Sequence, residues 1–284
     1  MRGSLIIRGG IPRYGRDIGP KRPKRTLVTK QIAPSVVGMK LAKVLLALAP
    51  VVIGVPVLAA TIPAGAAAAP VVVARYDFDA GATASGRIAE KSGRGVPLLI
   101  RTADRGSVKF SAAKVGKYVR MPLRCAAGAN TCPRALLEGG DDADLDPGTR
   151  AFRWGATILV PKSQLAGSSN VMQKGVSTTE SQWKMQVGET HGRAQCVVVG
   201  RGSTTNYLIR STVVVADGKW HTVLCQRSGG SLTISVDGKA RGKVTIPSNL
   251  SISNDKPLRV GGPNFNTSSD MYHGYLDNVY AALG

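Results

Sequence analysis

The chain has 284 residues, of which 43% are hydrophobic and 19% are charged, and this composition excludes a disordered protein. Its formal net charge is +21, but residues 1–69 hold 11 of the 38 basic residues and only one of the 17 acidic residues. Residues 70–284 therefore carry a net charge of +11, which favours anionic partners such as acidic glycans, wall polymers or nonspecifically bound nucleic acid. A basic surface without any partner is the alternative.

Residues 1–38 are rich in Arg, Gly and Pro, include the basic run 21–25 and show no apolar period. We expect them to be a disordered or non-native N-terminal extension, because Met39 stands where a signal peptide should begin. A basic arm that binds nucleic acid is the alternative. An export signal follows this segment, however, so we expect no specific nucleic-acid partner.

Residues 39–69 have the pattern of a signal peptide. Lys40 and Lys43 precede an apolar stretch over residues 44–60, and the alanines of residues 66–69 offer small side chains for cleavage. An uncleaved membrane anchor is the alternative, but Pro50 and Pro56 interrupt the stretch and favour cleavage. The sequence thus predicts a secreted protein that starts near residue 70 and meets the membrane only transiently, through its signal peptide.

From residue 71 onward, short runs rich in Val, Ile, Thr and Tyr are separated by Gly, Asp and Pro, and no helical period lasts three turns. This pattern predicts an all-β fold, a two-sheet antiparallel β-sandwich or jelly roll. No linker is evident, so residues 70–284 are predicted to form one domain. The predicted strands are 71–78, 96–101, 107–110, 118–123, 152–160, 171–174, 183–187, 194–199, 207–215, 220–227, 232–236, 242–246, 258–260 and 275–280.

The aromatic residues of two of these runs are predicted to lie in the core. Phe152 and Trp154 alternate with small or polar residues, and Trp183 shares a face with Met185 and Val187. Stacking of Trp183 on a sugar is the alternative for a strand on the concave side. Core packing is the favoured interpretation.

Residues 217–242 contain a histidine and a cysteine in what reads as a hairpin. Alternation places His221 on the same face as Val223 and Cys225, and an Asp-Gly turn at Asp237 ends the second strand. We therefore expect His221 to be a packed, hydrogen-bonded residue at the edge of the core rather than a catalytic base.

The four cysteines have the spacings C-x6-C and C-x28-C, with no C-x-x-C and no close pair of histidines, which disfavours zinc. An even number in an exported chain predicts two disulfides, for which the sequence allows three connectivities. Cys125 with Cys132 closes a short loop, and Cys196 with Cys225 joins two strands; this is the pairing we expect.

Several motifs resemble the laminin G-like (LamG) jelly rolls of the concanavalin A-like lectin and glucanase superfold, in the form secreted by bacteria. The run Asp217-Gly218-Lys219-Trp220-His221 is followed by an alternating strand that ends in Val236-Asp237-Gly238. The segments "ARYDFDAG", "AFRWGATILVP", "PLRVGG" and "YHGYLDNVYA" match other family strands in order, so that the resemblance covers residues 74–283. It implies a secreted module that binds carbohydrate or a cell-surface polymer through loops at the rim of the sandwich.

The chain lacks the motifs of the enzymes that share this superfold. It has no E-x-D-x-x-E carboxylate pair for glycoside cleavage, no Gln-x-His with Arg-x-Glu for a lyase, and no G-x-S-x-G nucleophile. We therefore expect a non-catalytic protein. A hydrolase or lyase with an atypical site is one alternative, and an extracellular module for protein adhesion is another.

Calcium is the one cofactor that the resemblance implies, as a single structural ion between the first and last strands. Asp77 and Asp277 stand at the matching positions, and carboxylate oxygens suit calcium. Two acids on surface strands without a metal are the alternative. A second acidic group, the aspartates at 141, 142, 144 and 146, lies in a Gly- and Pro-containing loop that we expect to be solvated.

Overall fold

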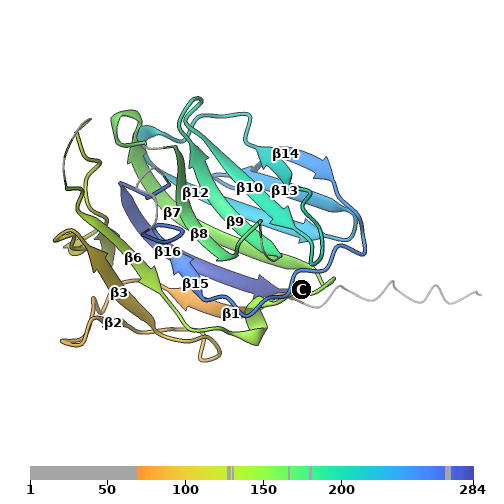
Figure 1. Cartoon of the computed structure of the whole chain (residues 1–284), viewed down its shortest axis with the longest axis horizontal. Helices are drawn as coiled ribbons and strands as arrows, with labels where there is room; N and C mark the ends of the chain where they lie inside the picture. Colours follow the sequence, from red (N-terminus) through yellow and green to blue (C-terminus); the bar gives the residue numbers. More distant parts are fainter. Residues whose placement is uncertain (1–68, 127–128, 130, 166, 179–180, 266–269) are drawn as a thin grey trace, which may run out of the picture. The chain divides into compact units, whose positions relative to one another are not determined.

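Short runs of residues, many of them alternating between apolar and polar side chains, build two sheets that face each other. The computed structural model describes residues 69–126, 129, 131–165, 167–178, 181–265 and 270–284, which contain sixteen strands and two short 3-10 helices (Figure 1). The predicted N-terminal extension and, except for Ala69, the predicted signal peptide lie outside the described residues. Within the described ranges, no helix is long and apolar enough to cross a membrane.

Sheet A is formed by strands from the whole length of the domain. Its order is β14-β13-β12-β7-β16-β5-β4, and β1 also pairs with β16. Its strands are β1 (Val71–Tyr76), β4 (Lys109–Ala112), β5 (Lys117–Arg120), β7 (Phe152–Pro161), β12 (Asp217–Ser228), β13 (Ser231–Val236), β14 (Lys239–Thr245) and β16 (Tyr275–Leu283).

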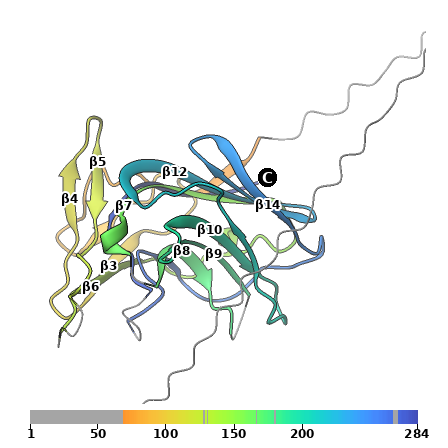
Figure 2. The same ribbon diagram turned by 90° about the horizontal axis from the view of Figure 1, so that it is seen from above.

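Sheet B forms the second layer, with the order β11-β10-β9-β8-β15-β6-β3-β2. Figure 2 shows β12 and β14 in one layer and β8, β9 and β10 in the other. Its strands are β2 (Arg87–Ile88), β3 (Leu98–Ala103), β6 (Arg134–Glu138), β8 (Ser168–Gly175), β9 (Gln182–Gly188), β10 (Arg193–Val199), β11 (Tyr207–Arg210) and β15 (Leu258–Val260). Every pairing between these strands is antiparallel, which confirms the predicted two-sheet antiparallel jelly roll.

Three aromatic rings fill the centre of the core between the sheets. Phe152 and Trp154 come from β7 and Trp183 from β9, none of them is exposed, and their ring centroids lie 5.3–5.8 Å apart. The indole nitrogen of Trp183 donates a hydrogen bond to the carbonyl oxygen of Leu145 at 2.9 Å. The core assignment of these residues is confirmed, and Trp183 is closed to any ligand.

Both expected disulfides are present. Cys196 of β10 is bonded to Cys225 of β12, so this disulfide ties sheet B to sheet A through the core. The bond between Cys125 and Cys132 closes the loop that leads into β6.

Two strands of sheet B were not predicted, β2 and β6. The segment Arg134–Glu138 contains Leu136 and Leu137 side by side and shows no alternation. Both leucines are buried: Leu137 faces the core, and Leu136 lies beside Gly262. A strand buried on both faces loses the period of two on which the sequence-based prediction depends.

Candidate functional site

His221 is the first candidate from the sequence, and the structure fixes it between two carboxylates. Its Nδ1 lies 2.8 Å from Asp237 Oδ2 and its Nε2 lies 3.1 Å from Asp217 Oδ1. Burial lowers the pKa of His221, but the hydrogen bonds to Asp237 and Asp217 outweigh burial and raise this pKa above its usual value. Because carboxylates only accept, the protonated imidazolium donates from both ring nitrogens, and this is the form that the two aspartates stabilise. The expected hydrogen-bonded histidine is what the structure shows.

The acidic loop at residues 141–146 is only partly solvated, because Leu145 is buried and aspartates of the loop pair with basic side chains. The fully buried Lys174 places its Nζ 2.8 Å from Asp146 Oδ1 and 2.9 Å from Asp141 Oδ1, and it also donates to the carbonyl oxygen of Asn254. Arg94 forms a bidentate pair with Asp144 on the same loop. The aspartates of the loop therefore attach it to the sandwich through ion pairs with Lys174 and Arg94.

The predicted calcium ligands lie on neighbouring strand ends. Asp77 follows β1, Asp277 lies in β16, and these two strands are paired through Tyr76 and Val279. Burial and then the negative charges of Asp79 and Asp77 raise the pKa of Asp277. A cation would relieve this repulsion, so the donor chemistry fits calcium.

Each of these three aspartates also accepts a backbone N–H bond, from Asp79 to Asp77, from Lys117 to Asp79, and from Asn278 to Asp277. Among the described residues, no group of three or more His, Cys, Asp or Glu side chains could hold a metal ion. Calcium at Asp77 and Asp277 stays a prediction.

A cluster of aromatic side chains lies on the outer face of sheet A. It consists of Tyr118 of β5, Tyr275 of β16 and Trp220 of β12, and is called the aromatic cluster below. The ring centroids of Tyr118 and Trp220 lie 5.4 Å apart, those of Tyr118 and Tyr275 5.5 Å, and those of Trp220 and Tyr275 6.3 Å. Their neighbours Val119 and Leu276 are buried in the core, so alternation turns the aromatic residues outward. Trp220 is 40% exposed, although it is one of the largest apolar side chains of the chain.

A basic pocket of about 400 Å³ opens beside the aromatic cluster. Arg105, Lys109, Arg120 and Arg124 line it together with apolar and small residues, and no acidic side chain is among its described lining residues. A smaller cavity of about 160 Å³ is lined by both Arg120 and Tyr275. The guanidinium carbon of Arg120 lies 5.7 Å from the ring centroid of Tyr275. Arg120 therefore connects the basic pocket with the aromatic cluster.

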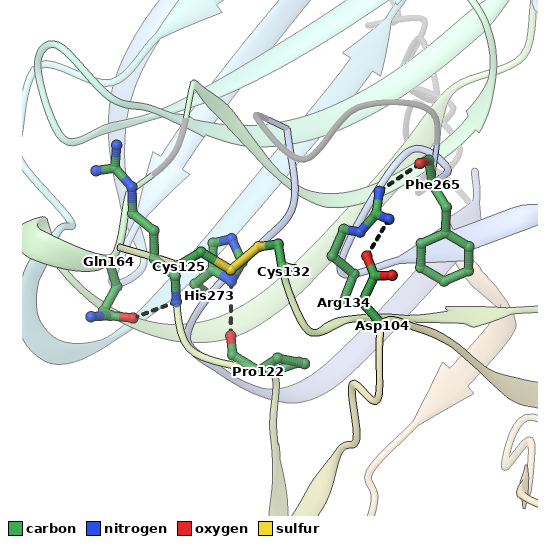
Figure 3. Close-up of a disulfide and its surroundings, with 9 residues drawn as sticks. Asp104, Pro122, Cys125, Cys132, Arg134, Gln164, Phe265 and His273 are labelled. Carbon is green, nitrogen blue, oxygen red and sulfur yellow. Dashed lines mark hydrogen bonds and ion pairs between the residues drawn. A yellow bond between two sulfur atoms is a disulfide. The ribbon is translucent and has the colours of Figure 1, made fainter. Parts of the chain in front are cut away.

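The wall of the basic pocket is fixed by the scaffold (Figure 3). The Nδ1–H of His273 donates to the carbonyl oxygen of Pro122 at 2.8 Å, and the backbone N–H of Arg124 donates to Gln164 Oε1 at 2.9 Å. The disulfide from Cys125 holds the next residue of the wall. Burial lowers the pKa of His273, which keeps its ring neutral and suited to a bond with a carbonyl. Three separate interactions therefore hold this wall of the pocket in place.

Comparison with known proteins agrees with this architecture. Residues 159–281 match the family Laminin_G_3, described as the Concanavalin A-like lectin/glucanases superfamily. The chain contains a laminin G-like domain. A search of the curated proteins found no match.

Among solved structures, the laminin G-like domain is similar to domain 4 of AbnA, a GH43 extracellular arabinanase from Geobacillus stearothermophilus, solved in complex with arabinotriose. The identity is 13% and the TM-score 0.56, over 76% of this chain and 93% of that one. It is also similar to the binding domain of Paraclostridial Mosquitocidal Protein 1, with 13% identity and a TM-score of 0.53. A third similar structure comes from work on the ganglioside-dependent cell entry of botulinum neurotoxin type C, with 11% identity and a TM-score of 0.54. Each toxin match covers 74% of this chain but only 48% and 47% of the toxin chain, so this chain spans about half their length. At these identities the likeness establishes the fold alone.

Two other cavities of the laminin G-like domain have polar linings. One, of about 690 Å³, lies against the acidic loop and includes Asp141, Asp146 and Asn254; the other, of about 430 Å³, includes Gln186 and Gln195. Neither has a Trp, Tyr or Phe among its described lining residues. Of the described surfaces, the aromatic cluster with the basic pocket therefore offers the most side chains suited to binding a ligand.

Sequence reasoning missed this surface. The sequence patterns assign no role to Trp220, Tyr118 or Tyr275 beyond membership of the predicted strands. One signal was available, because large aromatic residues at outward positions of strands are unusual on a solvated face. The basic pocket had no such signal, because its residues come from β4, β5 and the loops beside them.

Proposed function

We propose that this protein is a secreted, non-catalytic module that binds carbohydrate at a cell surface, and that the sugar chain lies on the aromatic cluster. The observation that carries the proposal is the trio of Tyr118, Trp220 and Tyr275 on the outer face of sheet A. The apolar C–H face of a sugar ring packs on an aromatic face and releases water from both, whereas its hydroxyl groups stay hydrated. Three rings on one face of the sheet can contact more than one sugar unit of a polymer.

The similar structures support binding as the general function. Domain 4 of AbnA was solved with arabinotriose, and the neurotoxin type C study concerns two ganglioside molecules. Laminin G-like domains are usually extracellular, which agrees with the predicted signal peptide. The proposal moves the ligand from the rim loops, where the sequence placed it, to a sheet face, because that is where the aromatic side chains gather.

Replacement of the most exposed ring tests this proposal. In Trp220→Ala we expect the affinity for bound glycan to fall about tenfold, because aromatic anchors contribute most of the binding free energy at such sites. Titration calorimetry against glycans selected from an array measures the change. The matched control is Leu208→Ala, which removes a side chain of similar exposure, 38%, from sheet B.

Three results would contradict the proposal. Equal affinities for Trp220→Ala and the wild type would exclude the aromatic cluster as the site. Release of reducing ends from a bound polysaccharide would favour the hydrolase or lyase alternative. An array without any bound glycan, together with capture of an extracellular protein, would favour the adhesion alternative.

A further inference from the structure

The basic pocket contains a pair of like charges that the fold does not neutralise. Lys109 of β4 and Arg120 of β5 are directly opposite each other across the antiparallel pair. Both point to the outer face, because Phe110 and Val119 between them pack against the core. Like charges in directly opposite positions destabilise a pair of strands. An anion between them would turn this repulsion into attraction.

Several basic side chains elsewhere in the domain have an acidic partner within hydrogen-bond distance. Arg134 pairs with Asp104 at 2.7 Å, Arg259 with Glu138 at 2.9 Å, and Lys174 with Asp146 at 2.8 Å. In the basic pocket, Arg124 alone has an ion pair among the described residues, with Glu189 at 3.3 Å. Both members of that pair are more than 40% exposed, so it contributes little. The positive charge of the pocket is therefore left for a ligand.

We infer that the carbohydrate is anionic, and that the basic pocket binds its carboxylate, sulfate or phosphate groups while the aromatic cluster holds its sugar rings. This inference rests on the proposed function and names its ligand class. Arg120 lines the pocket and lies over Tyr275, so one side chain touches both parts of the surface. A guanidinium can donate two parallel N–H bonds to a carboxylate, sulfate or phosphate.

The fixed wall adds to the affinity. The backbone from Pro122 to Cys125 is held by His273, by Gln164 and by the disulfide to Cys132 (Figure 3). A site whose backbone is already ordered loses less conformational freedom when it binds. The same rigidity keeps Arg120 and Arg124 on one surface even though their charges repel each other.

Three polymers with one backbone test the inference: neutral dextran, carboxymethyl dextran and dextran sulfate. We compare the full chain with the variant Lys109→Gln/Arg120→Gln and with the control Lys239→Gln/Lys243→Gln, which removes the same charge from exposed positions of β14. Residues 1–69 are the same in all of them, so their charge cancels in the comparison. Lys109→Gln alone, on the edge strand β4, serves as a second variant in case the double variant does not fold.

We expect the pocket variant to lose about tenfold in affinity for at least one charged dextran, because hydrogen bonds to charged groups are lost, and its salt dependence to become shallower. The control should change less than about threefold. Which charged dextran responds most distinguishes carboxylate from sulfate as the preferred group.

Two outcomes overturn the inference, and they separate it from the proposed function. Equal losses in the pocket variant and the control would show attraction by net charge only. Undiminished binding of all dextrans in the pocket variant, with loss in Trp220→Ala, would overturn the anionic ligand and leave the aromatic site standing. If no dextran and no glycan binds the wild type, both the inference and the proposed function fail.

Discussion

His221 is held by a carboxylate on each side of its ring. The contribution of these interactions to the stability of the domain depends on pH. Its pKa is raised above the usual 6.5 by Asp237 and Asp217, so its contribution to stability is complete below pH 6.5 and is lost as the pH rises through the raised value. The pKa of Asp217 is lowered, first by the hydrogen bond from the backbone N–H of Lys219 and then by the hydrogen bond with His221. Burial raises the pKa of Asp237, but the hydrogen bonds from His221 and from the backbone N–H of Thr222 outweigh burial and lower this pKa. The contribution of these carboxylates is complete above pH 3.8 and is lost in more acidic solution.

We therefore predict that this histidine stabilises the domain most between about pH 4 and pH 6.5. His221→Gln should lower the free energy of unfolding by about 1 kcal/mol at pH 5.5, since both carboxylates are partly exposed and water screens them, and by less at pH 9. Urea unfolding at a series of pH values measures the difference. His191→Gln, in an exposed turn, is the control. Parallel pH profiles for the wild type and His221→Gln would contradict this account.

Single residues were predicted well where their environment follows from the strand to which they belong. His221, Trp183, Cys196 and Cys225 lie in the predicted kinds of place because period-two alternation determines which face each side chain takes. The aspartates of the acidic loop were predicted poorly. Their partner Lys174 is 28 residues away from Asp146 and lies on a buried strand. The local sequence pattern does not predict that this lysine is buried.

At the level of elements, the two disulfides have different tasks. The bond between Cys196 and Cys225 links the two sheets through the core, whereas the bond between Cys125 and Cys132 fixes the wall of the basic pocket. Their loops also differ, with sequence separations of 29 and 7. In the chain-entropy description, a longer loop gives a larger stabilisation.

We predict that the paired replacement Cys196→Ala/Cys225→Ala lowers the free energy of unfolding by about 3–4 kcal/mol. Cys125→Ala/Cys132→Ala should cost about 2–3 kcal/mol and should in addition weaken binding of a charged dextran, because the wall of the pocket becomes mobile. Urea unfolding and titration of both variants separate the two effects. Equal loss of affinity in both variants would contradict a specific role of the Cys125–Cys132 disulfide in ordering the wall of the basic pocket.

Elements with a clean alternation were found from the sequence, and the two elements that were missed lack it. All eight strands of sheet A overlap predicted runs, apart from small shifts at their ends, because one face of each is apolar and the other polar. In sheet B, β6 is covered on both sides and β2 has only two residues, so neither offers a period to recognise. The binding surface depends on the placement of β4 and β5 beside β16, which is a matter of topology and not of any local pattern.

At the scale of the whole molecule, the first and last strands lie side by side. β1 and β16 are paired from Val71 with Leu283 to Tyr76 with Val279. Beyond the second of these pairs, the charges of Asp77 and Asp79 act on Asp277. The repulsion among these carboxylates acts at the end of the strand pair opposite to the one where Val71 lies beside Leu283. Their shared negative charge is the structural basis for the predicted calcium ion, which would bridge the strands.

Because burial and the nearby carboxylates raise the pKa of Asp277, its negative charge destabilises the metal-free fold at neutral pH. We predict that calcium at a hundredfold excess over its dissociation constant raises the melting temperature of the wild type by about 5 °C or more. Asp277→Asn, which keeps the acceptor for the N–H of Asn278, should be slightly more stable than the wild type in a chelator and should lose the response to calcium. Asp255→Asn, at an exposed loop position, is the control. A melting temperature that calcium leaves unchanged in the wild type would exclude the ion, and a gain in stability of Asp277→Asn in the chelator would then show that the three carboxylates meet without a metal.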